Sequence, residues 1–97
     1  MESQIRSFAE AVFRQEGMGS YELVVVDTAP LIWVDGYGQL KGEISFARHR
    51  VVLYIPINTD LEDAKLTILH EVAHHKTGPE HSWVWRAEYE RLVEKYL

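Results

Sequence analysis

The sequence predicts an α+β fold, in which an N-terminal helix precedes a small sheet and two further helices follow it. Three features support this class: a helical repeat of apolar residues near the start, β-branched or alternating segments in the middle, and two helix-like segments at the end. The chain has 97 residues, which suffice for one hydrophobic core, so we expect a single domain over residues 1–97. The sheet is expected to contain three or four strands in a mostly antiparallel or mixed arrangement.

The composition narrows the range of functions. Apolar residues make up 46% of the chain, the net charge is −5, and cysteine is absent. The acidic balance disfavours nucleic-acid binding, and the lack of cysteine excludes disulfides and thiolate metal ligands. No apolar segment approaches the ~20 residues of a membrane-spanning helix, and the N-terminus lacks the pattern of a signal peptide. We therefore expect a cytoplasmic protein that does not enter a membrane.

The first helix is expected over residues ~3–16, where apolar residues recur every three or four positions. Gly17 should end it, since glycine readily adopts the left-handed conformation that follows many helices. We interpret this helix as a packing element.

Four strand-like segments are expected in the middle of the chain. They cover residues 21–26, 31–34, 40–46 and 51–57. Turns are expected at residues 35–38 and 48–50. Pro56 should end the last strand or place it at an edge, because proline has no N–H to donate to a neighbouring strand.

A second helix is expected over residues ~60–77. Either Thr59 with Glu62 as a capping box, or Asp60 alone, should cap its start, and the Gly-Pro pair at 78–79 should end it. Its two apolar faces indicate burial around most of the circumference. The remaining polar stripe consists of Asp63, Thr67, His70 and His74. We expect the functional groups on that stripe.

A last helix is expected over residues ~81–96. Its inner face should carry, at helical spacing, Trp85, Tyr89, Leu92, Val93 and Tyr96. His81 and Glu88 lie close to the same line.

Residues 70–74 read His-Glu-Val-Ala-His, an H-E-x-x-H motif inside the second expected helix. His70 and His74 are four residues apart, so their rings lie one above the other on the helix and can reach a single ion. Glu71 projects about a quarter turn away, where it can meet a water on that ion without ligating the ion itself. The motif therefore predicts a metal site.

A third protein ligand is expected beyond the end of this helix. His81 is preferred, because imidazole is the commonest metal ligand and the Gly-Pro reversal can fold this residue back. Glu88, from the last helix, and Glu80 are the alternatives. No metal role is expected for His75, on the apolar side of the helix, or for His49, in a turn.

Zinc is the expected ion, with one ion per chain. Three nitrogen ligands and a water suit a tetrahedral catalytic zinc, whereas Mg²⁺ and Ca²⁺ prefer more oxygen ligands. Zinc would lower the pKa of its water towards ~7 and polarise a carbonyl, with Glu71 as the general base. Asp63 and Glu88 are candidates for supporting the ligand histidines. The candidates for stabilising an oxyanion are Tyr89, Tyr54 and Arg86.

The order of these elements, together with the motif, resembles minimal zincin domains, in particular SprT-like and WLM-type zinc metallopeptidases. The resemblance covers about residues 40–86 and rests on residues 51–55, on residues 69–74, and on the His-Ser-Trp segment at 81–83. It implies a zincin-like fold and a peptidase. It also implies that an edge strand within residues ~40–57 pairs with an extended substrate above the metal.

Several features separate the chain from related families. The gap from His74 to His81 is one residue longer than in metzincins, and no methionine follows the site, so the chain is not a metzincin. Bacterial endoribonucleases with three spaced histidines lack the motif's glutamate, so Glu71 argues against that class. Minigluzincins use a glutamate as the third ligand, and in that alternative Glu88 would replace His81.

The leading interpretation is a zinc-dependent metallopeptidase that hydrolyses peptide bonds through a metal-bound water activated by Glu71. One alternative is a zinc-binding protein-interaction domain without catalysis, which the presence of Glu71 disfavours. Another is a metal-dependent hydrolase of a non-peptide substrate such as nucleic acid, which the acidic charge disfavours. The expected partner is a protein or peptide substrate, and a chain this short leaves room for a partner domain or subunit that completes the cleft.

Overall fold

The structure, a computed structural model, describes residues 1–28, 33–34, 38–39, 41–56 and 59–97. In chain order its elements are α1 (Glu2–Gln15), β1 (Glu22–Val26), β2 (Trp33–Val34), β3 (Gly38–Gln39), β4 (Gly42–Ser45), β5 (Arg50–Tyr54), α2 (Leu61–Thr77) and α3 (Trp83–Tyr96). The predicted α+β class, with one helix before the sheet and two after it, is confirmed.

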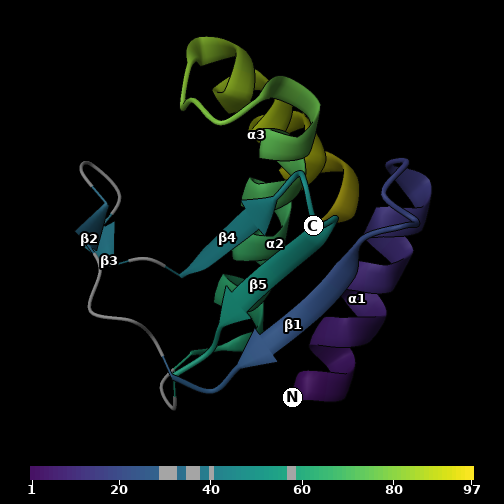
Figure 1. The fold of residues 1–97 in the computed structure, drawn as a ribbon, viewed down its shortest axis with the longest axis vertical. Coiled ribbons are helices and arrows are strands. Elements are labelled where there is room, and N and C mark those ends of the chain that lie inside the picture. Colours follow the sequence, from purple (N-terminus) through teal and green to yellow (C-terminus); the bar gives the residue numbers. More distant parts are fainter. Residues whose placement is uncertain (29–32, 35–37, 40, 57–58) are drawn as a thin grey trace.

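Three strands form a mixed sheet in the order β1-β5-β4 (Figure 1). β1 runs parallel to β5, and β4 runs antiparallel to it. β5 is therefore the central strand, and β4 forms one edge of this sheet. β2 and β3 pair antiparallel as a separate two-stranded ribbon.

The strands are shorter than the sequence suggested. β4 begins at Gly42 rather than residue 40, and β5 ends at Tyr54, two residues before Pro56. The turn between them is present but covers residues 46–49, and His49 has a φ of +50°. Of the other expected strand and turn positions, residues 31–32, 35–37, 40 and 57 lie outside the described part of the chain.

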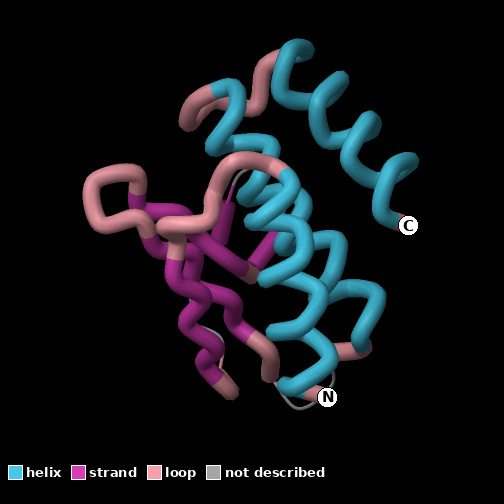
Figure 2. Tube along the Cα trace, turned by 90° about the vertical axis from the view of Figure 1, so that its right-hand side faces the viewer, coloured by secondary structure: helices cyan, strands magenta, loops and turns pink. Residues whose placement is uncertain are grey.

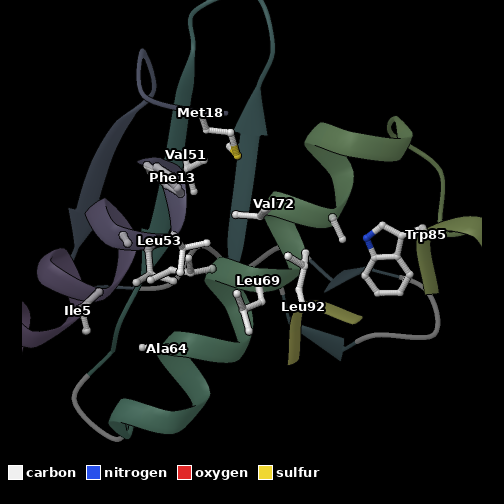
Figure 3. Packing of buried hydrophobic residues seen from close by; sticks show 14 residues of the cluster. Ile5, Phe13, Met18, Val51, Leu53, Ala64, Leu69, Val72, Trp85 and Leu92 are labelled. Carbon is white, nitrogen blue, oxygen red and sulfur yellow. The ribbon is translucent and has the colours of Figure 1, made fainter. Parts of the chain in front are cut away.

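The helices lie on one face of the three-stranded sheet (Figure 2). α1 and α2 pack against the strands, whereas α3 packs against α2. The core between these layers consists of Ile5, Ala9, Val12, Phe13, Met18, Val51, Leu53, Ala64, Ile68, Leu69, Val72, Ala73, Trp85 and Leu92 (Figure 3). Trp85 lies at one end of this cluster, beside α2 rather than between the helices and the sheet.

The end of α1 follows the prediction. Gly17 has a φ of +78°, and the N–H of Met18 donates to the carbonyl of Phe13 over 2.7 Å. This is the bonding pattern with which a left-handed glycine closes a helix. Met18 is fully buried, so the turn also brings an apolar side chain into the core.

α2 has two defined ends. Asp60 caps its start by accepting the N–H of Asp63 over 2.8 Å, so of the two predicted caps it is Asp60, rather than the Thr59–Glu62 pair, that bonds the backbone. Gly78 follows the last turn with a φ of +103°. The helix buries residues on two sides, as the apolar pattern indicated. These residues are Ala64, Ile68, Leu69, Glu71, Val72, Ala73 and His74.

α3 begins at Trp83, with the Ser82 hydroxyl capping the N–H of Trp85. His81 therefore lies in the connection between α2 and α3 and not in the first turn of the last helix, where the prediction had placed it. None of the helices in the described ranges is long and apolar enough to cross a membrane.

Candidate metal site and its cleft

Three imidazole rings converge at the C-terminal end of α2. The Nε2 atom of His74 lies 3.2 Å from Nε2 of His70 and 2.9 Å from Nε2 of His81, and the third pair is 3.1 Å apart. His70 and His74 are brought together by the helical repeat, and His81 returns from the connection after the Gly78 stop. In the part of the chain that the structure describes, this is the group of side chains able to hold a metal ion.

The geometry and chemistry of the three rings suit a transition metal. A tetrahedral zinc with bonds of ~2.0–2.1 Å separates its nitrogen ligands by roughly 3.3 Å, close to the observed spacings. Burial, and then the proximity of His74 and His81, lowers the pKa of His70 to about 3. Burial and His74 also lower the pKa of His81. Both rings are therefore neutral near pH 7, which is the form that binds a metal.

His74 is fixed by the residue that ends its helix. Its Nδ1 lies 2.9 Å from the carbonyl oxygen of Gly78, and since a carbonyl only accepts, Nδ1 carries the proton and donates. In the neutral form of the ring, which is the form that binds a metal, Nε2 is then the atom with the lone pair, and it faces the other two rings. The supporting group of His74 is thus a backbone carbonyl rather than one of the carboxylates considered from the sequence.

Trp85 lies against all three histidines. Its ring centroid is 4.6 Å from that of His70, 5.4 Å from that of His74 and 4.8 Å from that of His81. Its indole N–H donates to the carbonyl oxygen of His70 over 3.3 Å. Trp85 in turn stacks on Tyr89, with ring centroids 5.2 Å apart and planes 6° from parallel.

Glu71 lies beside the three rings but outside their point of convergence. Its Oε2 is 4.0 Å from Nε2 of His70, and the residue is only 4% exposed. Burial raises the pKa of Glu71 to about 8, and the Glu43 carboxylate adds to the effect. A cation held by the imidazoles would oppose this shift, because a nearby positive charge favours the carboxylate.

The histidines and Glu71 line a cleft of about 440 Å³. Its opposite wall is formed by β4 and the residues around it, including Gly42, Ile44 and Phe46. β4 is bonded to β5 on one side only within the three-stranded sheet, so the cleft runs along a sheet edge. The edge strand expected within residues ~40–57 is therefore β4.

Gly42 permits the close approach of β4 to α2. A Cβ atom at this position would lie 2.8 Å from Cγ2 of Thr67, 3.2 Å from the carbonyl oxygen of Val52 and 3.5 Å from Oε2 of Glu71. The first of these distances is too short for any side chain to be accommodated without movement. Gly42 thus sets the distance between the edge strand and Glu71.

The structure separates the remaining candidates for catalytic support. Tyr89 lines the cleft, with its ring 6.1 Å from that of His70. The Tyr54 hydroxyl instead donates to Glu43 over 3.0 Å, and Arg86 is exposed and 3.5 Å from Glu90. Of the three candidates for stabilising an oxyanion, Tyr89 is the one at the cleft.

The acidic candidates lie in different places. Both oxygens of Glu88 accept hydrogen bonds from Arg91, the shortest 2.6 Å long. Glu80 is exposed, and neither glutamate belongs to the three-residue group that could hold a metal. Asp63 is exposed and lines the cleft.

The other two histidines form a separate contact. The Tyr21 ring stacks on His49 at 4.8 Å, and its hydroxyl is 3.2 Å from Nδ1 of His75. Ser20 lies 2.8 Å from Nδ1 of His49. His75 is half-buried.

Two residues that shape the site were not recognised from the sequence as part of it. Trp85 was placed on the inner face of the last helix, although its spacing of four residues from both His81 and Tyr89 was a signal that the three share one side. Gly42 falls within the strand expected over residues 40–46, but the identity of the side chains opposite it depends on tertiary packing.

Comparisons with known proteins assign no family to the chain: no protein-family profile, curated protein or solved structure matches it.

Proposed function

We propose that the chain is a zinc-dependent metallopeptidase that hydrolyses peptide bonds, with His70, His74 and His81 as the zinc ligands and Glu71 as the general base. The observation that carries the proposal is the convergence of three Nε2 atoms with a buried carboxylate 4.0 Å from one of them. A purely structural zinc site has no use for such a carboxylate, whereas a hydrolytic site requires a base that is not itself a ligand.

When bound, zinc would supply Lewis acidity, which polarises a carbonyl oxygen and lowers the pKa of water. Glu71 would take a proton from the attacking water and deliver it to the nitrogen of the leaving amine. Tyr89, at the cleft beside His70, would donate its hydroxyl proton in a hydrogen bond to the developing oxyanion.

The position of β4 supports a peptide substrate. An edge strand offers unpaired backbone N–H and C=O groups, and an extended peptide can satisfy them by adding a further strand. The cleft along β4 also contains both the Glu71 carboxylate and the three histidines. A substrate held in this way would pass its backbone directly beside the catalytic groups, whatever the identity of most side chains.

The test compares wild-type protein with Glu71→Gln after expression in zinc-supplemented medium. Elemental analysis should find about one zinc per chain in both proteins, since Glu71 is not a ligand. Hydrolysis of an internally quenched peptide library should fall roughly 10²–10⁴-fold in the variant, the range that a general base contributes. Glu62→Gln, an exposed change in the first turn of the same helix, should retain full activity.

Undiminished cleavage by Glu71→Gln would remove Glu71 from this role. Absence of zinc in the wild-type protein would contradict the metal site itself. Zinc binding without any cleavage would instead favour a zinc-dependent interaction domain.

A further inference from the structure

One aromatic side chain contacts every member of the histidine triad. Trp85 is 4% exposed, and its ring lies within 5.4 Å, centroid to centroid, of His70, His74 and His81. The indole plane is 28° from that of His74, which is a stacked contact. It is 89° from that of His81, which is an edge-to-face contact.

The triad needs such support because its members have different anchors. His70 and His74 are held by the same helix, and His74 is further fixed by the carbonyl of Gly78. His81 lies in the connection between α2 and α3 and is exposed, so confining its side chain to one rotamer costs conformational entropy. To bind one ion, all three Nε2 atoms must direct lone pairs at the same point, where these repel one another, so neighbouring groups are needed to hold the rings in that arrangement.

Trp85 is placed to provide this restraint at two points. The indole N–H donates to the carbonyl of His70 over 3.3 Å, which ties α3 to the turn of α2 that presents the first ring. The indole ring also packs against the imidazole of His81, four residues earlier, and limits its rotamers. Because Trp85 is itself stacked on Tyr89 and buried in the core, the indole ring is held in place.

We propose that Trp85 is a positioning residue of the metal site, which pre-organises His81 and His70 for zinc and so sets the affinity for the ion. The inference rests on the proposed zinc site but not on peptidase activity. Residues behind the ligands of a metal site typically contribute roughly 10–100-fold in affinity, and this is the effect expected here.

The first test measures zinc affinity by competition with a chromophoric chelator. Trp85→Phe keeps an aromatic ring but removes the indole N–H and one of the two fused rings. The dissociation constant of this variant for zinc should rise roughly 10–100-fold. The matched control is Trp83→Phe, two residues earlier and 80% exposed, which should bind zinc as tightly as the wild type. Equal affinity in the two variants, with melting curves showing both folded, would overturn the proposal.

A second test needs no change at position 85. The double variant W33F/W83F retains Trp85 as its single tryptophan. Titration with Co²⁺, which quenches nearby indoles, should extinguish most of its emission at one equivalent, and zinc should restore the emission by displacement. Emission unaffected by bound Co²⁺ would show that Trp85 is not beside the ion and would overturn the proposal even if Trp85→Phe failed to fold.

The outcomes separate this inference from the proposed function. A wild-type protein that binds neither zinc nor Co²⁺ would overturn both. Tight zinc binding that is insensitive to Trp85→Phe would overturn the positioning role alone and leave the metallopeptidase proposal standing.

Discussion

At the scale of single residues, the three histidines share Trp85 as a neighbour but are anchored in different ways. His74 donates to a carbonyl at the end of its own helix, whereas the indole of Trp85 contacts His70 through the backbone and His81 through the ring. A backbone carbonyl cannot lose its acceptor function at any pH. The tautomer of His74 is therefore set by the Gly78 stop of α2 and not by an ionisable group.

The choice of third ligand can be tested at the same scale. His81→Ala should weaken zinc binding roughly a hundredfold or more, because it removes one of three converging nitrogens. Glu88→Ala should change the affinity less than about threefold, because the Glu88 carboxylate is engaged by Arg91 rather than directed at the triad. Competition with a chromophoric chelator measures both constants.

Both substitutions in this comparison should preserve the fold, since His81 is exposed and Glu88 is half-buried, with its ion-pair partner, Arg91, on the same helix. Circular dichroism of the zinc-free proteins checks this point. If Glu88→Ala proved the more damaging change, the site would belong to the glutamate-ligand alternative.

At the scale of elements, α2 serves the core and the cleft at once. Its apolar faces pack against the sheet, α1 and α3, while its remaining stripe presents His70 and His74 to the cleft. Because α2 makes contacts on almost every side, its rotation about its own axis is fixed. Any such rotation would displace the histidines and disrupt the core packing at the same time. This explains why its hydrophobic residues are spread around it rather than confined to one stripe.

The three helices are joined by one buried carboxylate. Glu16, just after α1, has a side chain that is 3% exposed and lies 3.0 Å from Lys76, 3.1 Å from Arg91 and 2.8 Å from Lys95. It also accepts the hydroxyl of Tyr96. Burial acts to raise the pKa of Glu16, but hydrogen bonds from these four groups outweigh it and hold the pKa well below its ordinary 4.5.

A pH-dependent loss of stability follows. Because the pKa of Glu16 is lower in the folded than in the unfolded state, ionised Glu16 stabilises the fold above pH ~4.5, and this contribution falls as pH decreases further. Glu16→Gln should therefore lower the free energy of unfolding by about 1–3 kcal/mol at pH 7 and by clearly less at pH 3. Urea denaturation at the two pH values, with chelator present, measures the difference.

The matched control for this prediction is Glu10→Gln, the same change at an exposed position of α1. It should alter stability by less than about 0.5 kcal/mol at either pH. A deficit for Glu16→Gln that is as large at pH 3 as at pH 7 would contradict the account.

At the scale of the whole molecule, the fold is a two-layer arrangement with the site at one edge. The helices cover a single face of a three-stranded sheet (Figures 1 and 2). The cleft is lined by residues of β4, which ends that sheet, and of α2. The site joins the edge strand, α2 and the connection to α3. An ion bound by the three histidines would cross-link α2 and its connection to α3, whose rings converge in the folded state and not in the unfolded chain.

Metal removal should consequently destabilise the whole protein. At a free zinc concentration a hundred times the dissociation constant, binding contributes about 2.7 kcal/mol, which in a domain of this size raises Tm by roughly 10 °C or more. Excess chelator should abolish that increase in the wild type and in Glu71→Gln. In His81→Ala, zinc should have little effect on Tm at the same concentration, and an undiminished increase there would contradict the ligand role of His81.

Several features were determined by the sequence alone, because they depend on local geometry. The ends of α1 and α2 follow from glycines at positive φ, and the pairing of His70 with His74 follows from a four-residue spacing on one helix. The expected return of His81 to those two rings also proved correct in geometry, since only a short reversal separates it from the helix.

Other features were decided only by the tertiary structure. The parallel pairing of β1 with β5, which makes β4 the edge, joins segments far apart in the chain and has no local turn signal. The same applies to Trp85 behind the rings, to Gly42 against Thr67 and to Glu16 among its cations. These contacts depend on which faces meet when all the elements pack together, and a pattern within a single element does not contain that information.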